Sequence, residues 1–161
     1  MSGTSEATVG LSLLRRIGLA AAAACLVAGL APQAARAETL TVAVGGLRNA
    51  MGLVEVAVCA DETCYDHQRG FAAVGREPAA LPKVLFTFDG LQPGRYALMM
   101  FHDENGNGRY DRDFLGLPRE GYGFSNDAKP VFGKPSWRKV AFDVPEGGAS
   151  IAVTMQYFNG E

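Results

Sequence analysis

Hydrophobic and polar residues alternate with a period of two through most of the chain after residue 38. Such alternation is typical of β-strands that bury one face against a core. The clearest segments predict six strands, at residues 39–44, 54–59, 83–88, 96–100, 140–144 and 151–157. A weaker seventh strand is expected at residues 69–74. No segment has the 3.6-residue periodicity of an amphipathic helix, so the chain is predicted to be all-β.

Residues that favour turns separate these segments. They include Gly45-Gly46, Asp89-Gly90, Pro93-Gly94, Asn159-Gly160 and the stretch 145–148. Glycine and asparagine tolerate positive φ, and proline presets φ for a turn. Six or seven short strands separated in this way, rich in β-branched and aromatic residues, favour a single antiparallel β-sandwich. A closed β-barrel is the alternative.

Residues 1–37 have the pattern of a secretory signal peptide. Arg15 and Arg16 precede an apolar run at residues 17–31, and Ala35-Arg36-Ala37 forms an A-x-A cleavage site. The run is shorter than the roughly 20 residues of a membrane-spanning helix. Cleavage after Ala37 is therefore expected, with an uncleaved anchor as the alternative. A periplasmic or secreted protein follows, without membrane insertion after cleavage.

Cleavage would leave one domain, residues 38–161, which is 124 of the 161 residues. This length is sufficient for a single hydrophobic core. Removing three arginines and one glutamate from the 15 basic and 17 acidic residues leaves 12 and 16, a net charge of −4. A weakly acidic domain has no overall attraction for nucleic acid or an anionic membrane, so neither is expected as a partner.

Only Cys59 and Cys64 would remain after cleavage. In an oxidising compartment, a pair so close in sequence most simply forms a local disulfide, which adds modest stability because its loop is short. The spacing differs from the C-x-x-C of redox enzymes, and two thiols without two nearby histidines do not complete a zinc site. Cys25 lies inside the apolar run of the signal peptide. A lipoprotein signal ending there would leave half of that run unused, so lipidation is the less favoured alternative.

Three motifs carry a resemblance to known proteins. Residues 88–98 (FDGLQPGRYAL) resemble the corner of transthyretin-like and carboxypeptidase-regulatory-like sandwiches, where a Pro-Gly turn leads a tyrosine-bearing strand into the core. With residues 102–108 (HDENGNG) and 115–126 (LGLPREGYGFSN), the segment 39–157 resembles the exported bacterial family catalogued as domain of unknown function 2141. The resemblance implies a periplasmic or secreted, antiparallel Greek-key (prealbumin-like) β-sandwich, and it implies no activity.

A connection at residues 103–136 separates the fourth predicted strand from the fifth. It is far longer than usual connections between strands. Its apolar content argues against disorder; the residues are Tyr110, Phe114, Leu115, Leu117, Tyr122, Phe124, Val131 and Phe132. We expect an ordered loop without regular secondary structure.

The loop begins with DENGNG at residues 103–108, which matches the calcium-loop pattern D-x-[DN]-x-[DN]-G. Oxygen atoms at alternate positions of a tight turn can converge on a hard cation. The predicted Ca²⁺ ligands are Asp103, Asn105, Asn107, the carbonyl of Arg109, Asp111 and Asp113, with Glu120 as a substitute for the last. Phe114 stands where an EF-hand has its glutamate, so the motif lies outside an EF-hand. Successive Asx-turns without metal are the alternative.

No complete catalytic constellation is present in the sequence. His102, Asp103 and Ser125 suggest a triad, but no G-x-S-x-G elbow accompanies them, and a nucleophilic serine is not expected. Asp111, Asp113 and Glu120 leave a hydrolase as a second alternative.

Four aromatic residues in or beside the loop suggest a carbohydrate-binding platform as the first alternative; they are Tyr110, Tyr122, Phe124 and Trp137. The function that the sequence favours is a non-enzymatic, calcium-stabilised module. It is expected to bind a protein or glycan of the cell envelope, or to have a structural role there.

Overall fold

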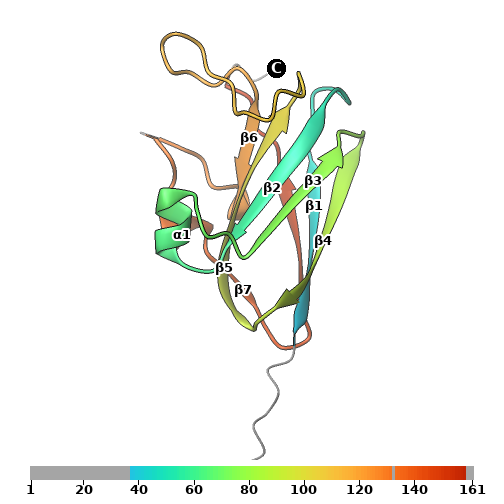
Figure 1. Cartoon of the computed structure of the whole chain (residues 1–161), viewed down its shortest axis with the longest axis vertical. Coiled ribbons are helices and arrows are strands. Elements are labelled where there is room, and N and C mark those ends of the chain that lie inside the picture. Colours follow the sequence, from blue (N-terminus) through green and yellow to red (C-terminus); the bar gives the residue numbers. More distant parts are fainter. Residues whose placement is uncertain (1–36, 132, 159–161) are drawn as a thin grey trace, which may run out of the picture. The chain divides into compact units, whose positions relative to one another are not determined.

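A computed structural model describes residues 37–131 and 133–158 of the chain (Figure 1). The predicted signal peptide, residues 1–37, lies almost entirely outside the described residues, so its cleavage stays a prediction. Within the described ranges, no helix has the length and apolar character needed to cross a bilayer.

The described residues form an all-β fold with eight strands in two mostly antiparallel sheets. The smaller sheet has the order β4-β1-β8, with β1 at Glu38–Gly45, β4 at Lys83–Leu91 and β8 at Ala149–Thr154. The larger sheet has the order β3-β2-β5-β6, with β2 at Leu53–Cys59, β3 at Ala73–Pro78, β5 at Gly94–Asp103 and β6 at Gly121–Phe124. Strand β7 (Phe142–Val144) pairs with the start of β5.

Alternate residues of both sheets form one hydrophobic core, as the sequence pattern predicted. Those with the least exposure include Leu40, Val42, Val44, Val54, Val56, Val58, Leu98 and Val153. The aromatic rings of Phe86 and Phe88 join this core from β4. The predicted alternation is therefore confirmed for the inward faces of β1, β2, β4 and β5.

Short helical segments lie at three places: α1 (Glu62–His67), the 3₁₀ turn η1 (Ser125–Asp127) and α2 (Trp137–Val140). The Asp61 side chain begins α1 by accepting the N–H of Cys64 at 2.8 Å, and Gln68 ends it in a left-handed conformation. The sequence pattern predicted no helix. Segments of three to six residues escape that prediction because they are too short to show a helical period.

The predicted disulfide is confirmed. Cys59 at the end of β2 is bonded to Cys64 in α1, with 5.5 Å between the Cα atoms. Both residues are buried with Tyr65, Ala97 and Val140 in a second, smaller apolar cluster. The bond fastens α1 to the outer side of the larger sheet.

The structure corrects several of the predicted strands. The weak strand expected at residues 69–74 lies instead at β3. Val140, which was expected to begin a strand, ends α2, and β7 begins at Phe142. Strands β1 and β8 pair in parallel, so the sandwich is not wholly antiparallel. The Greek-key order remains a prediction.

Strand β6 is the largest correction, because it lies inside the connection that was expected to lack secondary structure. Its core-facing positions are Gly121 and Gly123. A Cβ atom at Gly121 would lie 2.6 Å from the ring of Tyr157, and one at Gly123 would lie 2.2 Å from Met100. Because glycine fills these positions, the strand has no inward hydrophobic residues that a pattern could detect.

Candidate functional site

The outer face of the larger sheet carries two cross-strand rows of side chains. Strand register places Arg76, Glu55, Phe101 and Tyr122 in one row, and Val74, Ala57, Met99 and Phe124 in the next. Sheets that face water on one side usually have polar residues there. Here the second row is apolar throughout, and Phe101 and Tyr122 add two aromatic rings from the first row, which indicates that this part of the face is covered or binds something.

Two connections form walls over these rows and leave a groove of about 590 Å³. One wall is the loop between β5 and β6, which extends past the ends of β2 and β5 at the top of Figure 1. It contributes Tyr110, Arg112, Leu117 and Pro118, and the connection before α2 contributes Pro130, Val131, Gly133 and Lys134. A cavity of this size lies in the range of small-molecule sites.

Aromatic rings follow one another along the groove. The ring centroids of Phe101 and Tyr110 are 5.9 Å apart, those of Tyr110 and Tyr122 are 6.4 Å apart, and those of Tyr122 and Phe124 are 6.3 Å apart. Their tilted and edge-to-face geometry is favourable for aromatic pairs. Burial raises the pKa of Tyr110 well above its ordinary value, an effect that the Arg112 guanidinium partly opposes. The Tyr110 hydroxyl therefore stays protonated.

Three of the four aromatic residues suggested for a carbohydrate-binding platform line the groove. Tyr110, Tyr122 and Phe124 line the groove and are half-buried. Trp137 packs instead against Tyr65, with 6.1 Å between centroids, in the cluster around the disulfide. Three of the four predicted aromatics are thus brought together.

Met99 and Phe101 were not predicted as site residues. They lie in an uninterrupted apolar run at residues 97–101, in which both faces of β5 are hydrophobic. A run of this kind is typical of a strand covered on both faces. That signal could have indicated that the outer face of β5 is covered.

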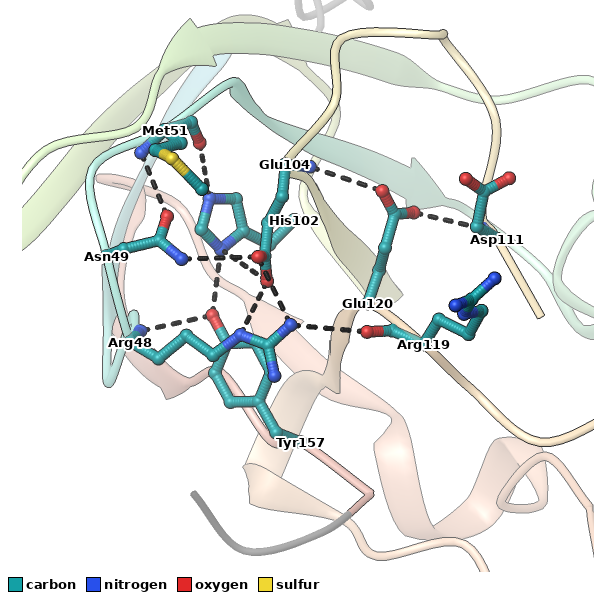
Figure 2. A network of polar contacts seen from close by, with 9 residues as sticks. All are labelled: Arg48, Asn49, Met51, His102, Glu104, Asp111, Arg119, Glu120 and Tyr157. Atoms are coloured by element: carbon teal, nitrogen blue, oxygen red, sulfur yellow. Dashed lines mark hydrogen bonds and ion pairs between the residues drawn. The ribbon is translucent and has the colours of Figure 1, made fainter. Parts of the chain in front are cut away.

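A buried polar network supports the base of the β5–β6 loop (Figure 2). His102 is fully buried, and its Nε2 lies 2.7 Å from the carbonyl of Met51. A carbonyl only accepts, so Nε2 carries the hydrogen. In the uncharged ring, Nδ1 then accepts the Tyr157 hydroxyl at 2.8 Å. His102 is therefore held between the β1–β2 connection and the segment after β8.

Glu104 connects the same network to the guanidinium group of Arg48. Its carboxylate accepts two hydrogen bonds from Arg48, at 2.8 and 3.1 Å, and one from Asn49 at 3.2 Å. The Arg48 guanidinium also lies 4.6 Å from the centre of the Tyr157 ring. Glu104 thus turns away from the predicted metal ligands, toward the β1–β2 connection, as Figure 2 shows.

Glu120 joins the two ends of the calcium-type motif from inside. Its Oε1 accepts the N–H of Glu104 at 3.2 Å, and its Oε2 accepts the N–H of Asp111 at 2.9 Å (Figure 2). Burial raises the pKa of Glu120; the Asp111 N–H opposes this shift, and the carboxylates of Asp111 and Asp103 add to it. Within the described ranges, no Lys or Arg pairs with these three acids.

The motif itself forms a compact turn. Asp103 is fully buried and accepts the N–H groups of Asn107 and Gly108 at 3.0 and 2.7 Å. Asn105 and Asn107 both direct their amide nitrogens to Oδ2 of Asp111, at 2.7 and 2.9 Å. Gly108 has φ of +73°, as expected for the sharp turn. The side chains of Asn105, Asn107 and Asp111 are therefore gathered at one place.

The remaining predicted ligands are placed differently. Asp113 accepts the N–H groups of Leu115 and Leu117, both at 2.8 Å, and so stabilises its own turn. Arg109 donates its N–H to Asn107 at 2.8 Å. Among the residues that the structure describes, no three His, Cys, Asp or Glu side chains are grouped to hold a metal ion. A Ca²⁺ site here would depend on amide and carbonyl oxygens as well as carboxylates.

Ser125 has a structural role in the fold. Its hydroxyl is fully buried, donates to the carbonyl of Val140 at 2.5 Å and accepts the N–H of Leu98 at 3.0 Å. These bonds join β5 to the end of α2. His102 makes its hydrogen bonds to Met51 and Tyr157 rather than to this serine.

These features define a small, disulfide-linked, all-β sandwich with an aromatic groove on the outer face of its larger sheet. The chain belongs to the bacterial family described as "Uncharacterized protein conserved in bacteria (DUF2141)", whose family model matches residues 42–152. This match confirms the resemblance carried by the sequence motifs. No curated protein and no solved structure matches the chain.

Proposed function

We propose that this protein is an exported binding module that holds a small, largely apolar ligand in the groove over β2, β5 and β6. One observation carries the proposal. The outer face of the larger sheet presents Met99, Phe101, Tyr122 and Phe124 to a walled cavity of about 590 Å³. Apolar lining with a few polar groups, at a concave surface, is typical of ligand pockets.

Binding of Nile red, an uncharged apolar dye, tests the proposed groove. Ala57 lies on the groove floor and faces away from the core, so Ala57→Trp fills the groove without disturbing the core. We expect the purified chain to enhance the fluorescence of the dye, and Ala57→Trp to weaken binding by about tenfold or more. Thr87→Trp, at an exposed position on the other sheet, is the matched control and should bind the dye normally. Equal binding by both variants would contradict the proposal.

A bound Ca²⁺ is proposed to hold the loop that forms one wall of the groove. The proposed ligands are Asp103, Asn105, Asn107, the Arg109 carbonyl and Asp111, with Asp113 or Glu120 completing the set. Support comes from the gathered side chains of Asn105, Asn107 and Asp111, and from three neighbouring acids without a basic side chain among the described residues. A half-turn of each amide would direct its oxygen to the ion. It would replace the bonds that these oxygens now accept from the N–H groups of Asn107 and Arg109.

Thermal unfolding tests the calcium site. For a dissociation constant of ~10⁻⁴ M, which is typical of extracellular modules, ~1 mM Ca²⁺ stabilises the fold by about 1.4 kcal/mol. The Tm should rise by several degrees, on the order of 2–6 °C. Asp103→Ala should abolish the shift. Glu104→Ala should keep it at a lower basal Tm, because Glu104 pairs with Arg48 instead. If neither Ca²⁺ nor chelator changes the Tm of metal-free protein, the proposed calcium site is wrong.

Export to the periplasm or the medium is part of the proposal. Its support is the signal-peptide pattern of residues 1–37 and a disulfide, which persists in oxidising compartments. The mature protein should begin at Glu38, and intact-mass measurement of the exported product checks this. We also propose the Greek-key connectivity that the resemblance to transthyretin-like sandwiches implies.

A further inference from the structure

We infer that the ligand of the groove is a long-chain carboxylate, whose alkyl chain lies along the groove and whose carboxylate is bound by Arg112 and Arg119. This inference rests on the proposed binding function and adds the chemical class of the ligand. It follows from a second hollow beside the groove, from the charges in that hollow and from the mostly apolar lining of the groove.

A second hollow of about 620 Å³ lies next to the groove. The two share four lining residues: Arg112, Leu117, Pro118 and Phe158. The second hollow has a different character, because Arg48 and Arg119 also line it. A ligand that occupies both must therefore be apolar at one end and able to bind arginine at the other.

The charges in the second hollow favour an anion. Arg48 is already paired with Glu104. Arg112 donates to the Gly116 carbonyl at 3.3 Å and lies 5.1 Å from the Tyr110 ring centre. Neither Arg112 nor Arg119 pairs with an acid in the described part of the chain.

One acid, Asp113, also lines this hollow. Its Oδ1 already accepts hydrogen bonds from the N–H groups of Leu115 and Leu117. Two guanidinium groups therefore outnumber one carboxylate here, on a chain whose net charge is −2. Guanidinium groups bind carboxylates through paired, charge-assisted hydrogen bonds.

The groove floor favours an alkyl chain over a sugar. Among the described lining residues, the charged ones besides Arg112 are Glu55 and Lys134. Glu55 lies 2.6 Å from Arg76, and Lys134 lies 3.4 Å from Asp66, so each is neutralised locally. The hydroxyl groups of a sugar would face Met99 and the aromatic rings, and burying them without hydrogen bonds is costly. An alkyl chain has no such cost.

Displacement of Nile red by two ligands of equal chain length tests this inference. Dodecanoate carries the carboxylate, and dodecan-1-ol lacks it; both are used below the concentrations at which they aggregate. Dodecanoate should displace the dye from the purified chain at about tenfold lower concentration than dodecan-1-ol. Combining Arg112→Gln with Arg119→Gln should remove this preference, because dodecanoate then loses the advantage of its carboxylate over dodecan-1-ol. Arg138→Gln, at an exposed position on α2, should keep it.

The outcomes separate the inference from the proposed function. If both ligands displace the dye equally, and the double arginine variant changes nothing, the carboxylate assignment is wrong and the groove proposal stands. If neither ligand displaces the dye while Ala57→Trp still weakens dye binding, the assignment of an alkyl chain is wrong and the proposed binding function is kept. If Ala57→Trp does not weaken dye binding, the proposed function itself is wrong.

Discussion

Replacing Glu120 with alanine should lower the free energy of unfolding by about 2–4 kcal/mol. The side chain is 5% exposed and holds the two ends of the loop motif together. It does so by accepting the N–H of Glu104 at 3.2 Å and that of Asp111 at 2.9 Å. Alanine removes both acceptors and leaves these backbone groups without their partner.

The magnitude follows from these two bonds. A hydrogen bond to a charged group contributes about 1.5–3 kcal/mol, so two give about 3–6 kcal/mol. Two effects reduce this value. Burial disfavours the charged Glu120 carboxylate, and the negative charges of Asp111 and Asp103 repel it. Alanine relieves both, and we therefore expect a net loss of about 2–4 kcal/mol, below the sum of the two bonds.

Urea unfolding near neutral pH, without Ca²⁺, measures the loss directly. Glu77→Ala is the matched control, because Glu77 is exposed on β3, and such changes usually fall within about 0.5 kcal/mol. Amide hydrogen exchange gives a local readout. The N–H groups of Glu104 and Asp111 should exchange faster in the Glu120 variant, because the loop opens more often.

The reasoning fails if Glu120→Ala unfolds within about 0.5 kcal/mol of the wild type. It also fails if both amides keep their protection in the variant. Either result would mean that contacts other than the buried carboxylate hold this wall of the groove.

Three further predictions concern pH, backbone packing and the disulfide. The folded state raises the pKa of Glu120 above 4.5, so the folded protein binds a proton there more readily than the unfolded chain does. The free energy of unfolding should therefore rise as the pH falls through the interval just above 4.5. Urea titrations should show a smaller rise for Glu120→Gln, which does not titrate. Gly52→Ala should cost ~2 kcal/mol more than Gly70→Ala in urea unfolding, because both have φ near +70° but only the Cβ at Gly52 would meet a backbone atom, 1.9 Å from the carbonyl oxygen of Asp103. Replacing Cys59 and Cys64 together with alanine should cost about 2 kcal/mol, and a reducing agent should destabilise the wild type without affecting this variant.

The sequence by itself determined the all-β class and the inward faces of most strands. Val42, Val54 and Leu98 could be assigned to the core because side chains alternate across a strand whatever that strand pairs with. The disulfide was also predictable, since Cys59 and Cys64 are near neighbours in sequence. Motifs at residues 88–126 were sufficient to indicate the family.

The position and lining of the groove depend on the tertiary structure and could not be predicted from the sequence. Arg76, Glu55, Phe101 and Tyr122 form one row because three pairs of strands adopt a particular register, and no local pattern states which strands pair. Strand β6 was missed for a related reason. Its inward positions are glycines selected by the closeness of Tyr157 and Met100, so the residue pattern reflects neighbours that are distant in sequence. Contacts between such distant segments exist only after folding, and they place the loop wall, the aromatic rows and the arginines around one cavity.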